Sequence, residues 1–388
     1  MSDVHVAGVG MTHFGAHPER TGRDLFAEAG SAALEDSGVD RGDVEALYYG
    51  NFMSELAEHQ GHQGPMMAEA VGLQVPATRF ESACASSGAA LRQAILDVQS
   101  GESDVLLVGG AERMNNLGTA GATEALAIAA DDLYEIRSGV TFPGAYALMA
   151  RAYFEEYGGD QEDLAHVAVK NHDNALPNDH AQFQKAIDVE DALEAPMVAD
   201  PLGLYDACPF TDGASALVVT SEEYAEENDV DAGVTITGSG QGGDRLALQN
   251  RDYLARTPAT EEAAAEAYDD AGVSVDDVEL AEVHDCFTIA EVMAIEGLGL
   301  YETGEGIGAA RAGETTRDGD VPVNLSGGLK AKGHPVGATG ASQVAEMTRL
   351  LRGDHPRSDA VADATTGVTH NAGGTVASAV VHVLEVEG

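Results

Sequence analysis

The stretch Ala33-Leu-Glu-Asp-Ser-Gly-Val-Asp-Arg-Gly-Asp-Val-Glu45 recurs in the second half of the chain as Ala267-Tyr-Asp-Asp-Ala-Gly-Val-Ser-Val-Asp-Asp-Val-Glu279. In each copy an amphipathic helix ends near a glycine, and a short turn leads into a predicted strand, 46–49 or 280–283. The strands are followed by polar residues, Asn51 and His284. This internal match predicts that the chain consists of two related halves.

Later segments match in the same order. Residues 86–90 open a helix as residues 338–342 do, and two glycine-led runs, 213–219 and 374–381, are typical of buried strands. Strands and helices alternate in both halves, which predicts an α/β fold: duplicated βαβαβ halves in a layered α-β-α-β-α arrangement. The helices beginning at Cys84 and near Gly337 are expected to be equivalent, with N-termini facing one shared site.

The predicted organisation has three parts. Residues 1–112, completed by residues 211–230, form the N-terminal half, and residues 231–388 form the C-terminal half. Residues 113–210 are expected to be an inserted loop domain, irregular and helical with several prolines. Insertions of this length usually cover an active site or bind substrate.

The charge of the chain is strongly acidic. Its 66 acidic and 20 basic residues give a formal net charge of −46, and only four residues are lysine. The carboxylates are dispersed through apolar-periodic segments, which indicates an acidic surface on a folded protein rather than a disordered tail. Such a surface is typical of a halophile's cytosolic protein and excludes nucleic-acid binding, which requires a basic footprint.

The remaining composition indicates a cytoplasmic location. The three cysteines are too few for a disulfide framework or a cysteine-rich zinc site. No uninterrupted apolar stretch of about 18 residues is present, so no membrane span is expected. The N-terminal residues also lack the basic region and apolar run of a signal peptide.

Cys84 is the leading candidate for a nucleophile. It stands among small residues just before an apolar helix, where the helix dipole favours a thiolate. Three later segments each place a histidine on a glycine-rich or strand-end stretch: His284-Asp-Cys-Phe287, Gly333-His-Pro-Val-Gly-Ala-Thr-Gly340 and His370-Asn-Ala-Gly-Gly374. Convergence of these side chains on the thiol predicts nucleophilic catalysis.

The same segments resemble the thiolase superfamily, and within it the branch of archaeal acetyl-CoA acetyltransferases and sterol-carrier-protein-2-type thiolases. The resemblance covers essentially the whole chain and is most specific in 324–340. It implies condensation of two acetyl-CoA to acetoacetyl-CoA and CoA, or the reverse thiolysis, through an S-acetyl-cysteine. Cys84 matches the nucleophile and His334 the base. His334 with His284, and the backbone N–H groups of Cys84 and Gly373, match the two oxyanion holes.

The second acid/base stays open in the sequence. Most thiolases provide a cysteine in a C-terminal Cys-x-Gly motif, but this chain has His370-Asn-Ala-Gly-Gly there. Cys286 in the His-Asp-Cys-Phe segment is slightly favoured for this role. His370 is the alternative. Considered without the resemblance, Cys286 is more typical of a core thiol, and His370 fits a structural hydrogen bond equally well.

Contacts with coenzyme A are less readable. Lys330 and Lys332 are candidates for binding its phosphates or for local salt bridges, and Arg245 and Arg251 are further candidates. Ser326 and Gly327 resemble family positions near the thioester. No metal ligand set and no cofactor beyond the CoA thioesters are expected.

The sequence leaves two alternative functions open, and the resemblance implies several partners. A degradative 3-ketoacyl-CoA thiolase of broader chain length and a non-catalytic acyl-CoA-binding or scaffold subunit are the alternatives. The resemblance implies a homodimer or homotetramer. It also implies a small OB-fold zinc-ribbon partner and hydroxymethylglutaryl-CoA synthase as neighbours in the mevalonate pathway.

Overall fold

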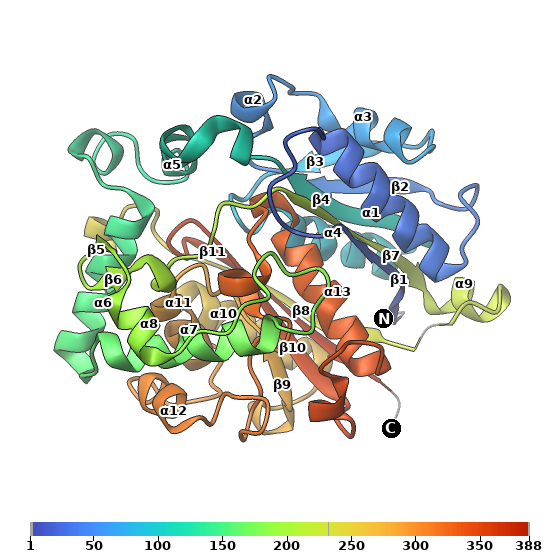
Figure 1. Cartoon of the computed structure of the whole chain (residues 1–388). Helices are drawn as coiled ribbons and strands as arrows, with labels where there is room; N and C mark the ends of the chain where they lie inside the picture. The colour runs from blue at the N-terminus through green and yellow to red at the C-terminus, as the bar shows by residue number, and fades with distance from the viewer. Residues whose placement is uncertain (1–2, 232, 387–388) are drawn as a thin grey trace.

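The computed structural model describes residues 3–231 and 233–386. Nine strands form one sheet in the order β3-β2-β4-β7-β1-β8-β11-β10-β9 (Figure 1). The strands of the first half are β1 (Val4–Met11), β2 (Ala46–Gly50), β3 (Ala77–Phe80), β4 (Val105–Glu112) and β7 (Gly213–Ser221). Those of the second half are β8 (Thr235–Gly243), β9 (Leu280–Glu282), β10 (Thr366–Gly373) and β11 (Ser378–Glu385).

The strand pairing confirms the duplication. In the first half β2 is parallel to β4, β4 is antiparallel to β7, and β7 is antiparallel to β1. In the second half β9 is parallel to β10, β10 is antiparallel to β11, and β11 is antiparallel to β8. A parallel bridge between Ala281 and Val323 takes the place that the parallel β2–β3 pair has in the first half. The two half-sheets meet where β1 pairs with β8 at His5 and Thr235.

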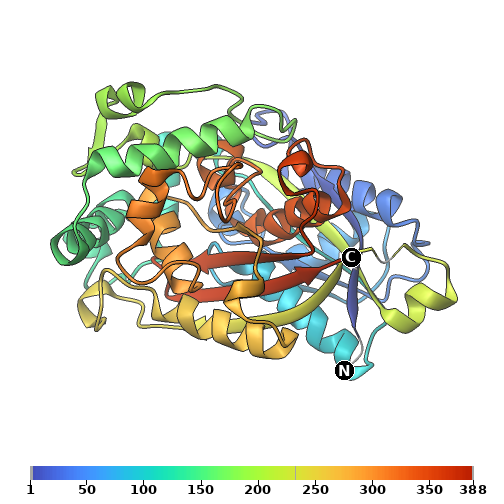
Figure 2. The same ribbon diagram turned by 90° about the horizontal axis from the view of Figure 1, so that it is seen from below.

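Helices cover and separate the half-sheets. On the outer faces, α1 (Gly22–Ser37) packs on β1 and β7, and α10 (Pro258–Ala271) packs on β8 and β11. Between the half-sheets lie α4 (Ser86–Ser100) and α13 (Thr339–Arg352), which contact each other. Figure 2 shows the strands of the second half between α10 and α13. The expected α-β-α-β-α layering is therefore present.

The repeated glycine of the opening motif ends a helix in both halves. Gly38 follows α1 with φ 68°, and Gly272 follows α10 with φ 73°. This left-handed conformation is unfavourable for residues with a Cβ atom and stops the helix where the next strand must begin. At its other end α1 is capped by Thr21, whose side chain accepts the Asp24 N–H.

The segment between β4 and β7 crosses to the other half of the molecule. It contains helices α5 (Gly118–Ala127), α6 (Phe142–Tyr157), α7 (Gln161–Ala175) and α8 (Val189–Glu194), with the short strands β5 (Met197–Ala199) and β6 (Leu202–Gly203). Helix α7 packs against α11 (Thr288–Gly297) and α12 (Gly306–Ala312) of the second half. The domain boundaries assigned from the sequence remain a prediction.

The remaining helices are peripheral. They are α2 (Ser54–Ala57), α3 (Gln63–Ala70) and α9 (Glu222–Glu227). Across residues 3–231 and 233–386, no helix combines the length and the apolar character needed to cross a lipid bilayer. Residues 1–2 lie outside the described residues. They belong to the N-terminal segment from which the absence of a signal peptide was predicted.

Candidate active site

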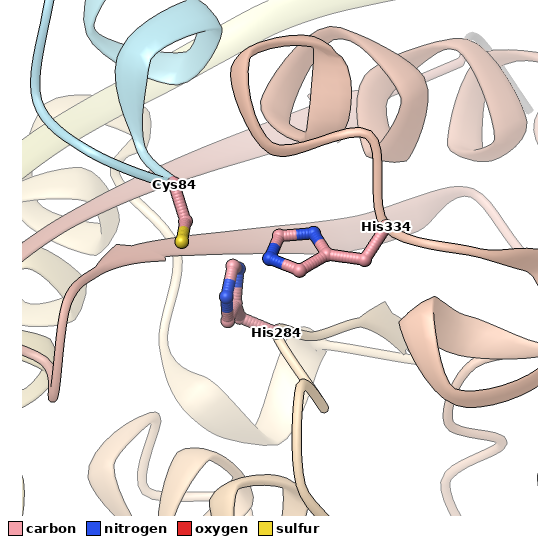
Figure 3. A group of neighbouring side chains, drawn as sticks. All are labelled: Cys84, His284 and His334. Atoms are coloured by element: carbon pink, nitrogen blue, oxygen red, sulfur yellow. The ribbon is translucent and has the colours of Figure 1, made fainter. Parts of the chain in front are cut away.

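Three side chains from distant parts of the sequence converge between the halves. Cys84 precedes α4, His284 follows β9, and His334 precedes α13. Their sulfur and ring nitrogen atoms lie within 4.8 Å of one another, and all three residues are buried (Figure 3). The two imidazole rings meet edge to face, with centroids 5.0 Å apart. The convergence expected from the sequence is therefore present for these three residues.

Cys84 stands on a tight turn rather than on the helix itself. Helix α4 begins at Ser86, two residues later than the predicted start at Cys84. Ala83 adopts φ 49°, which is uncommon for a residue with a Cβ atom. The turn is held by Glu81, which accepts the Ala83 N–H, and by the Ser86 hydroxyl, which donates to the Ala83 carbonyl. These contacts direct the thiol into the site.

The resting thiol and its neighbouring imidazole are both neutral. Burial raises the pKa of Cys84 to about 12, and burial lowers the pKa of His334 to about 3. The expectation of a helix-stabilised thiolate was wrong, because desolvation outweighs the dipole of a helix that begins only at Ser86. His334 likewise does not titrate near neutral pH. The thiol proton must therefore move during the attack itself.

Each histidine has one ring nitrogen held by a protein group. Nδ1 of His334 lies 2.7 Å from the Thr339 hydroxyl oxygen. Nδ1 of His284 lies 3.2 Å from Nδ2 of Asn371, and that amide also donates to the Cys84 carbonyl oxygen at 3.1 Å. The other nitrogen of His284, Nε2, is buried and has no hydrogen-bond partner among the residues that the structure describes. In Figure 3 the free ring nitrogen of His334 points toward the thiol and His284.

Cys84 and His334 line a cavity of about 420 Å³, and His284 lies behind them, outside its wall. Most of its wall is apolar, and the segment between β4 and β7 contributes most of the lining. This segment supplies Met114, Thr119, Thr123, Leu126, Ala129, Phe142, Pro143, Val198, Leu204, Ala207, Cys208, Pro209 and Phe210. A cavity of this size and character suits an organic ligand with an apolar portion.

Cys286 also lines this cavity. Its thiol lies near the buried Tyr146 hydroxyl, which donates to the Gly374 carbonyl at 3.0 Å. The Tyr146 ring stacks on Phe287 with centroids 4.6 Å apart. Burial raises the pKa of the Cys286 thiol well above its usual value. The geometry therefore places a protonated, positioned thiol in the wall of the cavity that contains Cys84.

The side chain of His370 lies on the face of β10 that is turned away from the cavity and toward α10. Its Nε2 lies 3.0 Å from the Thr260 hydroxyl of α10, and its Nδ1 accepts the His284 backbone N–H at 3.4 Å. Both ring nitrogens thus have protein partners, and the ring does not line the cavity. Burial lowers the pKa of His370 to about 3. This arrangement favours the structural hydrogen bond over the role of second base.

The glycine beside the thiol is Gly374, which follows the expected Gly373. Gly374 lines the cavity, and against the larger effect of burial its backbone N–H lowers the pKa of the Cys84 thiol. Gly373 instead pairs with Ser378 in the β10–β11 ladder. The difference arises because β10 extends through Gly373, so that the chain turns into the cavity only at Gly374.

The predicted CoA-binding residues lie outside the cavity wall. Ser326 donates to Glu282 through its hydroxyl, at 2.6 Å, and Gly327 is buried against Ala175. Lys332 is fully buried and lies 3.7 Å from the Glu346 carboxylate. Of the two predicted roles of Lys332, binding of a CoA phosphate or a local salt bridge, the structure contains the salt bridge.

The other basic candidates are also engaged by protein groups. Lys330 is buried above the Tyr205 ring, and burial lowers its pKa to about 8. Arg245 is half-exposed and pairs with Asp252. Arg251 donates to Thr375 in the loop after β10. None of these groups lines the cavity in the part of the chain that the structure describes.

The hydrogen bonds around His284 disfavour a metal at the converging residues. A sulfur and two imidazoles are suitable zinc ligands, and a ligating histidine normally donates its second N–H to a carboxylate or carbonyl. Here the second nitrogen of His284 faces the Asn371 amide, which already donates to the Cys84 carbonyl. Ligation through Nε2 would place a proton on Nδ1 against that amide donor. The residues present do not fit a metal site.

Several residues of the site were not identified from the sequence. Asn371, Thr339, Tyr146 and Gly374 all contact the candidate catalytic groups. For Asn371 a signal was available, because side chains alternate along a strand. Adjacent residues of β10 must face opposite sides, so either His370 or Asn371 can face the site, but not both.

The pKa of Cys84 leads to a prediction about its chemical reactivity. We expect alkylation of Cys84 by iodoacetamide to be slow at pH 7 and to accelerate about tenfold per pH unit up to pH 10, since only the thiolate reacts. Rates measured by mass spectrometry of the Cys84 peptide test this. A plateau of the rate near pH 7 would mean that the resting enzyme holds a thiolate.

Comparison with known proteins identifies the class. Residues 4–223 match the model of the thiolase N-terminal domain, and residues 240–386 match that of the thiolase C-terminal domain-like family. The chain belongs to the thiolase family. The fold, with its duplicated halves and its cysteine between two histidines, agrees with this assignment.

Individual relatives extend over the whole chain. An acetyl-CoA acetyltransferase of Methanothermobacter thermautotrophicus is 44% identical, with 99% of each chain covered. A protein of the same name from Methanocaldococcus jannaschii is 41% identical over the same shares. Among solved structures, the Ltp2–ChsH2(DUF35) aldolase has a TM-score of 0.82 at 26% identity, covering 99% of this chain and 98% of the other.

Proposed function

We propose that this protein is an acetyl-CoA C-acetyltransferase that condenses two acetyl-CoA into acetoacetyl-CoA and CoA and catalyses the reverse thiolysis. The observation that carries the proposal is the convergence of Cys84, His284 and His334, two of which, Cys84 and His334, line the cavity. The near full-length relatives named acetyl-CoA acetyltransferase support the choice of substrate. The reaction needs no metal or organic cofactor, because the thiol and the imidazoles provide the nucleophile, the base and the oxyanion donors.

The first half-reaction loads the enzyme. The sulfur of Cys84 attacks the carbonyl carbon of acetyl-CoA while Nε2 of His334 takes the thiol proton. The tetrahedral intermediate then collapses to S-acetyl-Cys84, and the departing CoA sulfur recovers the proton from His334. The neutral resting pair suits this sequence, since charge separation occurs only when a substrate carbonyl is present to receive it.

The second half-reaction forms the carbon–carbon bond. In this step Cys286 first gives its thiol proton to the unprotonated Nε2 of His334. The Cys286 thiolate then removes an α-proton from a second acetyl-CoA, and the resulting enolate attacks the acetyl group on Cys84. The bond to the Cys84 sulfur breaks, giving acetoacetyl-CoA, and that sulfur takes the proton back from His334, so that both thiols end protonated. The cavity position of Cys286 supports this role, and the engaged ring of His370 speaks against the alternative.

Two groups of donors stabilise the developing oxyanions in this proposal. Nε2 of His284, buried without a partner, faces the site beside His334. The second group is the backbone around the thiol, where the Gly374 N–H replaces the expected Gly373 and joins the N–H of Cys84. Fixed donors of this kind typically contribute a factor of about 10² to 10³ each to kcat.

Thiolysis of acetoacetyl-CoA by the purified protein is the direct test. The assay is run in about 2 M KCl, where charge screening is nearly complete. Turnover with an acetyl group on Cys84, detected by mass spectrometry, is the expected result. A labelled Cys84 without turnover would indicate a missing partner subunit. Neither signal in a folded sample would overturn the enzyme assignment and favour an acyl-CoA-binding or scaffold subunit.

A degradative 3-ketoacyl-CoA thiolase is the second candidate. The apolar cavity wall, built from α5, α6 and residues 198–210, supports acceptance of longer acyl chains. Values of kcat/KM for thiolysis of C4 to C12 3-ketoacyl-CoA distinguish the two functions. A maximum at C4 supports the acetyltransferase, and a rise with chain length supports the degradative enzyme.

Partners are proposed on two grounds. Large exposed apolar side chains gather on the segment between β4 and β7, including Leu133, Tyr134, Leu148 and Met197, and such a concentration is typical of an interface. The solved relative is a complex with a DUF35 protein. We propose a homodimer or homotetramer with a small OB-fold zinc-ribbon partner and hydroxymethylglutaryl-CoA synthase nearby, which would place the product in the mevalonate pathway.

We propose that this protein works in a cytoplasm of high salt content, because its surface is strongly acidic. Three of the four lysines, Lys170, Lys330 and Lys332, are buried, so the surface of the described residues carries a single lysine, Lys185. At molar salt the Debye length is about 3 Å and the mutual repulsion of the carboxylates is screened. We expect the midpoint of thermal unfolding to rise by more than about 10 °C between 0.1 and 2 M KCl. An unchanged midpoint would contradict the proposal.

A further inference from the structure

The two facing histidines have different neighbours at Nδ1. The Thr339 hydroxyl has a single hydrogen, and this hydrogen goes to the Pro335 carbonyl oxygen at 3.1 Å. A hydroxyl that donates to Pro335 accepts from His334, and with this placement the 2.7 Å contact fits a proton on Nδ1 of His334. Its Nε2, which points to the thiol, is then without a proton.

The neighbour of His284 has the opposite requirement. The Cys84 carbonyl oxygen accepts only, so the Asn371 atom that lies 3.1 Å from it must be the NH₂ group. The second hydrogen of that NH₂ group points to Nδ1 of His284 at 3.2 Å. Nδ1 of His284 must therefore accept, and the proton of the neutral ring is on Nε2.

A second feature agrees with this orientation of the Asn371 amide, whose buried Oδ1 accepts no hydrogen bond from the described residues. Its Oδ1 atom is wedged between Gly88 near the start of α4 and Gly340 near the start of α13. A Cβ atom added at these glycines would lie 2.7 Å or 2.4 Å from Oδ1. Helix N-termini carry partial positive charge and favour an oxygen over an amide nitrogen there. The slot thus favours the orientation in which Oδ1 faces the two helix N-termini.

We propose that Thr339 and Asn371 are positioning residues that hold His334 and His284 in opposite neutral tautomers. His334 is protonated on Nδ1 and presents a bare nitrogen to the thiol, while His284 is protonated on Nε2 and presents an N–H to the site. The roles of base and oxyanion donor, which rest on the proposed function, are in this way assigned by two neutral side chains that do not touch the substrate.

The tautomers can be measured without any enzymatic activity. In protein labelled with ¹⁵N-histidine, two-bond ¹H–¹⁵N correlation spectra separate bare from protonated ring nitrogens, and His284→Gln and His334→Gln spectra assign the signals. We expect a bare Nδ1 in His284 and a bare Nε2 in His334. In Asn371→Asp, where a carboxylate accepts instead of donating, the Nδ1 of His284 should become protonated. A protonated Nδ1 of His284 in the parent protein would overturn the proposal.

Kinetics of the same variant provide the second readout. We expect kcat to fall about 100-fold in Asn371→Asp with KM changed less than about threefold, because the donor acts mainly on the transition state. Asn228→Asp, an exposed position, is the matched control. A fall in kcat with an unchanged His284 tautomer would reduce Asn371 to a structural residue and overturn the proposal.

Gly88→Ala tests the slot with Asn371 itself intact. The three heavy atoms nearest to the new methyl group all belong to Asn371, so the methyl should displace that amide, shift the His284 signals and lower kcat. Gly308→Ala, in α12 with open space around it, is the matched control. Unchanged His284 signals in a folded Gly88→Ala protein would contradict the wedge. The NMR spectra test the tautomer assignment, and the thiolysis assay tests the proposed thiolase function. Because the two measurements are separate, either hypothesis can fail while the other holds.

Discussion

Replacement of Cys84 by alanine should abolish turnover, lowering kcat for acetoacetyl-CoA thiolysis by about 10⁴-fold or more, because no other group can form the covalent intermediate. The cavity contains two further thiols, Cys208 and Cys286, but neither stands on the strained turn or receives the Gly374 N–H. The variant should also show no acetyl adduct by mass spectrometry after incubation with acetyl-CoA.

The stability of the Cys84→Ala protein serves as its control. Removing one buried sulfur leaves a small cavity, and we expect the free energy of unfolding to change by no more than about 2 kcal/mol. A folded variant with full activity would end the proposed mechanism. An acetyl adduct on Cys286 in a still active variant would move the nucleophile to the other cavity thiol.

Replacement of Cys286 by alanine should separate the two half-reactions. Exchange of labelled CoA into acetyl-CoA needs only Cys84 and His334, so it should persist within about threefold. Condensation needs removal of the α-proton and should fall about 10² to 10⁴-fold, the usual contribution of a positioned acid/base. Both rates are measured on the same preparation in high salt.

The alternative base is tested by the matched variant His370→Gln. Both ring nitrogens of His370 are hydrogen-bonded to protein groups on the side of β10 away from the cavity. We therefore expect condensation and exchange to decrease together and by less than about tenfold, as for a structural change. Selective loss of condensation in His370→Gln, with Cys286→Ala active, would reverse the assignment.

The duplicated architecture was predictable because it depends on local patterns. The matched segments that begin at Ala33 and Ala267 both form a helix ended by a left-handed glycine and followed by a strand. Their apolar periodicity and glycine positions are local properties, which explains why the prediction was confirmed. The expected position of α4 was off by two residues, since backbone contacts of the turn at Ala83 delay its start.

Predictions that depended on the surroundings of a side chain were less successful. Lys332 was considered for CoA phosphates, yet it is fully buried beside Glu346. A thiolate was expected at Cys84, yet desolvation keeps the thiol protonated. Burial and desolvation are sums over neighbours from many parts of the chain, so a lysine or cysteine in one sequence window does not reveal them.

The sequence alone determined the duplicated α/β fold, the thiolase resemblance, and the three residues Cys84, His284 and His334, since each depends on residue types at fixed spacing. Only the tertiary structure showed that Cys286 and Gly374 line the cavity, that both ring nitrogens of His370 contact protein groups, and that Asn371 is the partner of His284. The physical reason is that these choices depend on which face of a strand a side chain occupies and on which donors and acceptors surround it, and both are set by packing of the two halves.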